Sequence, residues 1–118
     1  MIKWGIIGAG HIAQRFAKSL IHSDQGKLYA VASHTDTKLD LFKEEYPGVS
    51  TYIDYMQLLE DENVDVVYIA LRHKDHYKWS KEALLHKKAV LCEKPATLTV
   101  EEIIDLKKTS FENQTFFM

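Results

Sequence analysis

A glycine-rich segment near the start of the sequence has the residue types and spacing of a phosphate-binding turn. Gly8, Gly10 and Ala13 occupy the small-residue positions of a G-x-G-x-x-A pattern. The first glycine permits a tight turn, the second leaves room for a pyrophosphate against bare backbone, and the small third residue lets helix and strand pack closely. The phosphates would lie at the N-terminus of the following helix, where unpaired N–H groups favour an anion. The pattern favours dinucleotide binding, and the alternative is a purely structural turn.

A second polar position follows the predicted second strand. In a dinucleotide-binding fold an acidic residue there holds the 2′-hydroxyl of NAD, but this sequence has Ser33, His34 and Thr35. With no carboxylate to repel it, a 2′-phosphate could be accommodated by Ser33, Thr35 and a protonated His34. The sequence therefore favours NADP over NAD, although this segment contains no arginine to decide the choice. The alternative is a plain polar loop.

Two more polar segments follow predicted strands. The segment 72–76, RHKDH, follows the strongest strand, and Glu93, Lys94 and Pro95 follow a later one. Ligands of open α/β sheets bind outside the carboxyl ends of the strands, so both segments should share an edge with the glycine turn. Pro95 disfavours a helical Lys94 and ends the strand, which holds a lysine at this edge. For 72–76 the alternative is a solvated loop in which Asp75 caps the next helix.

The elements that position these residues alternate between strand and helix. Apolar runs predict strands at 2–7, 28–32, 49–52, 64–71 and 89–92, and a further strand that begins at 115. Helical spacing predicts helices over about 12–20, from Asp36 or Thr37 to 46, after Asp54, over about 76–86, and from a capping box at Thr99 and Glu102. This order predicts an α/β domain with a parallel sheet.

Composition excludes several classes of protein. The 118 residues are the length of one domain, and 46% hydrophobic with 27% charged residues is typical of a globular protein. The net charge of −2 gives no basic excess, so we expect no nucleic-acid partner. No apolar run approaches the length of a membrane span and no signal peptide is evident, so we expect no membrane segment and a cytoplasmic location. Cys92 is the single cysteine and should be a buried thiol, and His73 with His76 lacks a third ligand at helical spacing, so we expect no metal site.

Taken together, these motifs resemble the N-terminal half of the Gfo/Idh/MocA oxidoreductases, the family of glucose-fructose oxidoreductase, inositol dehydrogenase and rhizopine catabolism proteins. The resemblance covers essentially the whole chain, and its most specific parts are GIIGAGHIA at 5–13 and KAVLCEKPATLT at 88–99. It implies a doubly wound Rossmann domain over 1–118 with three α/β/α layers. It also implies a C-terminal substrate domain, absent from this chain, which carries the family's principal acid/base histidine.

The resemblance also implies roles for individual residues. By position, the pyrophosphate would be lined by Gly8, Gly10, His11 and Ile12, the adenosine ribose by Ser33 and His34, and the nicotinamide by Glu93 and Lys94. Lys94 would be catalytic, because a lysine there can polarise a carbonyl oxygen as hydride arrives or support the proton transfer. His76 matches the histidine of the family's T-P-x-x-x-H loop, whereas Leu71 and Arg72 replace its threonine and proline. We expect Leu71 and His76 to be cofactor-binding residues.

The predicted function is that of an NAD(P)-dependent oxidoreductase that transfers hydride between the nicotinamide and a sugar-, cyclitol- or diol-like alcohol or carbonyl. The substrate would bind through the missing domain, so this chain alone is expected to be an inactive fragment, cut as an apolar strand begins. The alternatives are a stand-alone nucleotide-binding or redox-sensing module and a structural domain with a vestigial site. A full-length parent would form a homo-oligomer through the second domain's sheet. This chain would be monomeric or would pair through the sheet edge at Phe116 and Phe117.

Overall fold

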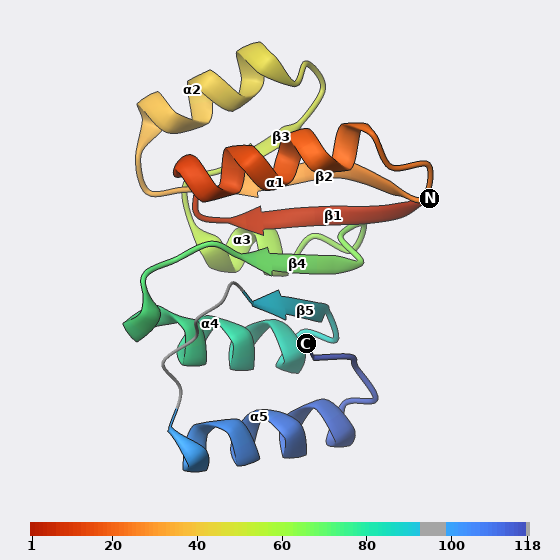
Figure 1. Ribbon diagram of the computed structural model, residues 1–118, viewed down its shortest axis with the longest axis vertical. Helices are drawn as coiled ribbons and strands as arrows, with labels where there is room; N and C mark the ends of the chain where they lie inside the picture. Colours follow the sequence, from red (N-terminus) through yellow and green to blue (C-terminus); the bar gives the residue numbers. More distant parts are fainter. Residues whose placement is uncertain (93–98, 118) are drawn as a thin grey trace.

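Five parallel strands in the order β3-β2-β1-β4-β5 form the sheet on which the chain is built (Figure 1). The computed structural model describes residues 1–92 and 99–117. The strands are β1 (Ile2–Ile7), β2 (Gly26–Ala32), β3 (Ser50–Tyr52), β4 (Val66–Ile69) and β5 (Ala89–Cys92). The helices are α1 (His11–Ile21), α2 (Asp36–Glu45), α3 (Tyr55–Leu59), α4 (His73–Leu85) and α5 (Val100–Glu112). The chain therefore starts in the middle of the sheet and winds outward in both directions, as a doubly wound fold does.

Side chains that alternate along the strands supply two separate hydrophobic cores. Ile6, Val31 and Tyr68 lie on one face of the sheet with the buried residues of α1 and α2. Their neighbours Ile7 and Ile69 lie on the other face with the buried residues of α3, α4 and α5. Because each central strand is covered on both faces, its sequence is almost uniformly apolar. The predicted three-layer α/β/α arrangement is confirmed.

Several predicted element boundaries are wrong, among them the start of β2, at Gly26 rather than 28, and the end of β4, at Ile69 rather than 71. Helix α4 begins at His73 rather than 76, with Arg72 as its N-cap, so Asp75 does not cap the helix but lies in its first turn. An acidic side chain is favourable anywhere in that turn, and its type alone does not mark the boundary. Thr35, rather than Asp36 or Thr37, is the N-cap of α2. Strand β4 starts at Val66 because the Val64 N–H belongs to a turn, where it donates to the Asp61 carbonyl.

The outer edge of β5 is paired with the end of the described chain. The Val90 N–H donates a 2.8 Å hydrogen bond to the Phe116 carbonyl, and Val90 forms a parallel bridge with Phe117. The strand predicted from 115 therefore begins beside β5 in the parallel sense. The capping box of Thr99 and Glu102 is present at the start of α5, and Cys92 is buried as expected. Among the described residues, no helix is long and apolar enough to cross a membrane.

A polar network ties the edge strand β3 to the residue before β5. The Tyr52 hydroxyl donates a 2.7 Å hydrogen bond to the Asp61 carboxylate, and Lys88 Nζ donates to the Asp61 carbonyl at 2.7 Å. The hydrogen bond to Asp61, together with burial and the Asp61 charge, raises the pKa of Tyr52 to about 12. The network thus holds the phenol protonated in the folded protein.

Replacing Asp61 by Asn should lower the pKa of Tyr52 from about 12 towards the ordinary value of about 10. The amide carries no charge and is a weaker acceptor than the carboxylate, so it stabilises the protonated phenol less. Since the folded-state pKa is raised, this contribution to stability is present below about pH 10 and is lost as the pH rises through 12. The titration can be followed by NMR of ring-labelled tyrosine, with the exposed Asp24→Asn as control. An unchanged Tyr52 titration in Asp61→Asn would contradict the network.

Candidate functional site

The turn between β1 and α1 is held against the ends of both neighbouring strands. Gly8 has a φ of +99°, and a Cβ built on it would lie 2.4 Å from the Ala70 carbonyl oxygen at the end of β4. The Gly8 N–H donates a 2.8 Å hydrogen bond to the Ala32 carbonyl at the end of β2. A side chain is excluded at Gly8 by both space and backbone conformation. The carboxyl ends of β1, β2 and β4 therefore meet at this residue.

Gly10 presents bare backbone to open space at the start of α1. It is the N-cap of the helix, and a Cβ added to it would meet no described atom within 4 Å. The first turn of α1 contains no acidic residue. Its N–H groups and the positive end of the helix dipole are therefore not neutralised by a carboxylate of that turn, an arrangement that suits a phosphate. Ala13, one turn further, is fully buried against the sheet.

The segment after β2 combines a fixed serine with an exposed histidine and an exposed lysine. Ser33 is only 5% exposed, and its Oγ accepts a 3.1 Å hydrogen bond from the Thr35 N–H. The Ser33 N–H donates to the Tyr52 carbonyl at 3.0 Å, which fastens this segment to β3. His34 and Lys38 are exposed beyond it. The site therefore has a cation, and no carboxylate, among its lining residues from this segment.

The segment after β4 is fastened by a buried histidine. His76 is 1% exposed, and its Nε2 lies 2.7 Å from the Leu71 carbonyl oxygen. A carbonyl can only accept, so Nε2 carries the proton and donates. The Asp75 N–H also donates to the Arg72 carbonyl at 2.9 Å. These two bonds set the path of the loop although its threonine and proline are replaced by Leu71 and Arg72.

A row of aromatic rings crosses the same edge of the sheet. The rings of His34 and Tyr55 are stacked, with centroids 4.1 Å apart and planes 9° from parallel. The Trp79 ring meets Tyr55 edge to face, at 5.0 Å and 82°. The row joins the loop after β2, the start of α3 and the second turn of α4. It gives this end of the site flat apolar faces.

These segments enclose a cavity of about 500 Å³ at the carboxyl ends of the strands. Its lining residues come from the glycine turn, the segment after β2, α3 and the segment after β4. They are Gly8, Ala9, Gly10, Ser33, His34, Thr35, Lys38, Tyr55, Ala70, Leu71, Arg72, Asp75 and Trp79.

Five of the predicted cofactor-binding residues line this cavity, namely Gly8, Gly10, Ser33, His34 and Leu71. His11 and Ile12 lie at the exposed start of α1, and Ile12 lines a separate hollow along that helix. His76 does not line the cavity but holds the Leu71 carbonyl behind it. The predicted residues Glu93 and Lys94 lie outside the described residues.

Sequence reasoning missed Lys38, Tyr55 and Trp79 as lining residues. Trp79 lies inside the helix predicted over about 76–86 and Tyr55 in the helix predicted after Asp54, and neither belongs to one of the motifs. A usable signal existed, because the residues that begin the helices after β2 and β3 must lie at the carboxyl edge. Applying that rule to every strand would have found Lys38 and Tyr55.

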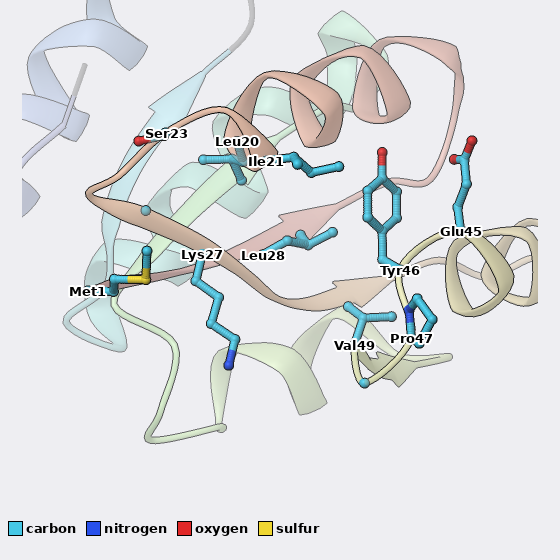
Figure 2. Close-up of a pocket in the computed structure, with 12 residues that line it drawn as sticks. Met1, Leu20, Ile21, Ser23, Lys27, Leu28, Glu45, Tyr46, Pro47 and Val49 are labelled. Atoms are coloured by element: carbon cyan, nitrogen blue, oxygen red, sulfur yellow. The ribbon is translucent and has the colours of Figure 1, made fainter.

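A second hollow, of about 410 Å³, lies at the opposite edge of the sheet (Figure 2). Figure 2 shows apolar side chains such as Leu28 beside Tyr46, near the C-terminal ends of α1 and α2. Burial and the nearby Glu45 charge raise the pKa of Tyr46. The C-terminal ends of α1 and α2 lie at this hollow, and its charged side chains Lys27 and Glu45 offset each other, so it lacks the helix N-terminus that favours a phosphate at Gly10. The cavity at the carboxyl edge is therefore the candidate dinucleotide site.

Comparison with known proteins places the chain in a family. Residues 2–118 match the profile of the Gfo/Idh/MocA oxidoreductase family, described as having an NAD-binding Rossmann fold. The chain belongs to this family. The D-xylose 1-dehydrogenase (NADP(+)) of Hypocrea jecorina is 34% identical over 129 residues, which cover 99% of this chain and 33% of that enzyme. The trans-1,2-dihydrobenzene-1,2-diol dehydrogenase of Mus musculus is 32% identical over 119 residues, covering 99% of this chain and 36% of the enzyme.

Solved structures of similar proteins agree with the family assignment. A 3-ketoreductase from Actinomadura kijaniata, in complex with NADP, superposes with a TM-score of 0.92 at 32% identity, covering 99% of this chain and 37% of that one. An NAD-binding protein from Listeria innocua also gives 0.92, at 26% identity, with 99% and 34% covered. The chain thus spans about a third of the length of the relatives it matches.

The two turn glycines should differ in how much stability the same substitution costs. Gly8→Ala should destabilise the fold by at least about 2 kcal/mol, because φ is positive and the new Cβ meets the Ala70 carbonyl. Gly10→Ala should cost no more than about 1 kcal/mol, since its Cβ enters open space. Urea unfolding of both variants measures the difference. Equal losses of stability would contradict the close approach at Gly8.

Proposed function

We propose that this chain is the cofactor-binding part of an NAD(P)-dependent oxidoreductase that acts on a sugar-, cyclitol- or diol-like alcohol or carbonyl. The observation that carries the proposal is the start of α1. Gly10 faces open space in the cavity there, and the first turn of the helix contains no acidic residue. A pyrophosphate fits there in shape and charge. Family membership supports the same assignment.

Within this proposal, NADP is the preferred cofactor. Ser33 stands where an acidic residue would repel a 2′-phosphate, and Lys38 brings a cation to the same wall of the cavity. Thr35 and His34 offer further donors beside them. The D-xylose dehydrogenase relative uses NADP(+), and the ketoreductase structure holds NADP, which supports the preference. When bound, the cofactor supplies hydride transfer, and the chain's own residues hold and orient it.

The substrate and the second half of the site are part of the proposal. The relatives that share this domain act on D-xylose or a dihydrodiol, or are described as a 3-ketoreductase. Each is about three times as long as this chain, so we infer that a substrate domain outside these residues completes the enzyme. The family resemblance suggests that such a domain also forms a homo-oligomer. Lys94 would act at the nicotinamide end by stabilising charge on the reacting oxygen.

Titration of the chain with NADPH and NADH tests cofactor binding and the preference together. Saturable quenching of the tryptophan fluorescence of Trp4 and Trp79, of which Trp79 lines the cavity, is expected with both dinucleotides, with NADPH the tighter ligand. Lys38→Ala should weaken NADPH binding about tenfold and leave NADH binding unchanged, because only NADPH carries the 2′-phosphate.

The matched control is Lys43→Ala, which removes an exposed lysine from the last turn of the same helix, away from the cavity. If neither dinucleotide gives a saturable response, the proposed function fails. If Lys38→Ala weakens both equally, the assignment of Lys38 to the 2′-phosphate is wrong.

The proposed role of Lys94 can be tested in a longer polypeptide that carries this domain and a substrate domain. Lys94→Ala should lower kcat by about 10² to 10⁴-fold, since a general acid or electrostatic stabiliser is removed. The dissociation constant of NADPH, measured by calorimetry, should stay within about twofold of the unaltered protein. Lys87→Ala, at an exposed position before β5, is the control. Loss of NADPH affinity in proportion to kcat would make Lys94 a binding residue instead.

A further inference from the structure

The part of the cavity lined by His34, Tyr55 and Trp79 has the features of a base-recognition site, an inference that rests on the proposed function. Tyr55 is its centre. Its ring is stacked on His34 and lies nearly perpendicular to the ring of Trp79. All three side chains line the cavity. Flat aromatic faces of this kind bind the π-face of a base but do not distinguish one purine from another.

A carboxylate stands beside this aromatic surface. Asp75 lines the same cavity and lies half-buried in the first turn of α4. Burial raises the pKa of Tyr55, the charge of Asp75 raises it further, and Arg72 lowers it. The Asp75 carboxylate and the Arg72 guanidinium therefore both lie near enough to the Tyr55 phenol to affect it electrostatically. Among the described residues, no salt bridge or side-chain hydrogen bond uses the Asp75 carboxylate, which leaves its oxygens available as acceptors there.

The backbone beneath this carboxylate is fixed at two points. The Asp75 N–H donates to the Arg72 carbonyl at 2.9 Å, and the next residue, His76, holds the Leu71 carbonyl at 2.7 Å from within the core. The carboxylate is thus carried by a helix turn rather than by a free loop. A group placed in this way can read a hydrogen-bond donor at a defined position.

We propose that Asp75 accepts a hydrogen bond from the exocyclic amine of the adenine of a bound dinucleotide, with the base lying against the aromatic surface of His34 and Tyr55. Adenine carries a donor at its 6-position, whereas hypoxanthine carries a carbonyl oxygen there. A carboxylate attracts the first and repels the second. A site built to pair with a donor discriminates strongly against an analogue that lacks it. Asp75 is therefore a specificity-determining residue for the purine.

The test compares NADPH with its hypoxanthine analogue, reduced nicotinamide hypoxanthine dinucleotide phosphate, on the full chain by calorimetry. The unaltered protein should bind the analogue at least about tenfold more weakly. In Asp75→Asn the ratio of the two dissociation constants should approach one, because an amide presents both an acceptor for the amine and a donor for the carbonyl. Asp40→Asn, an exposed position of α2 outside the cavity, is the matched control and should keep the full ratio.

The outcomes distinguish failure of the role of Asp75 from failure of the proposed function. Equal affinity for the two dinucleotides in the unaltered protein overturns the role of Asp75 and leaves the proposed function in place. Tighter binding of the analogue also overturns it, because the Arg72 guanidinium would then be the group that reads the base. A ratio that persists in Asp75→Asn overturns it as well. Absence of saturable binding by either dinucleotide overturns both proposals.

Discussion

The approach of one backbone to another at Gly8 is the constraint on which the site depends. The Gly8 Cα lies so close to the Ala70 carbonyl that no side chain fits, while its N–H is bonded to the Ala32 carbonyl. Three strand ends are thereby joined at one residue. The segments that follow β1, β2 and β4 therefore start close together, and the cavity lies between them. The polar residues Ser33, Arg72 and their neighbours share it because their strands end at the same place.

The charge environment of the two sheet edges follows from chain direction. In a sheet of parallel strands joined by right-handed crossovers, every helix starts at the carboxyl edge and ends at the amino edge. The carboxyl edge therefore collects helix N-termini, among them the uncapped start of α1 at Gly10. The amino edge collects helix C-termini, and there Glu45 and Tyr46 line the hollow in Figure 2. The two hollows therefore differ in the helix ends beside them, which are N-termini at the carboxyl edge and C-termini at the amino edge.

The sequence was sufficient for those parts of the fold that depend on local pattern. The G-x-G-x-x-A turn and the apolar runs of the strands predicted the parallel sheet and its three layers, because both follow from short-range chemistry. Helix starts were less certain, since Asp75 is as favourable inside the first turn as at its cap. The role of His76 was not visible at all. Its Nε2 bonds a carbonyl five residues earlier across a loop, and that contact depends on the path of the loop rather than on spacing.

In the loop after β4, the residue that anchors the backbone is different from the residues that face the cavity. The histidine that fixes the backbone lies in the core, whereas the side chains at 71, 72 and 75 that the backbone presents point to the cavity. One residue thus fixes the loop backbone, and other residues are available to contact a ligand. Substitutions at the contacting positions change what the loop offers a ligand without removing the bond that shapes it. Such a division lets the side chains that face a ligand be exchanged while the loop keeps its shape.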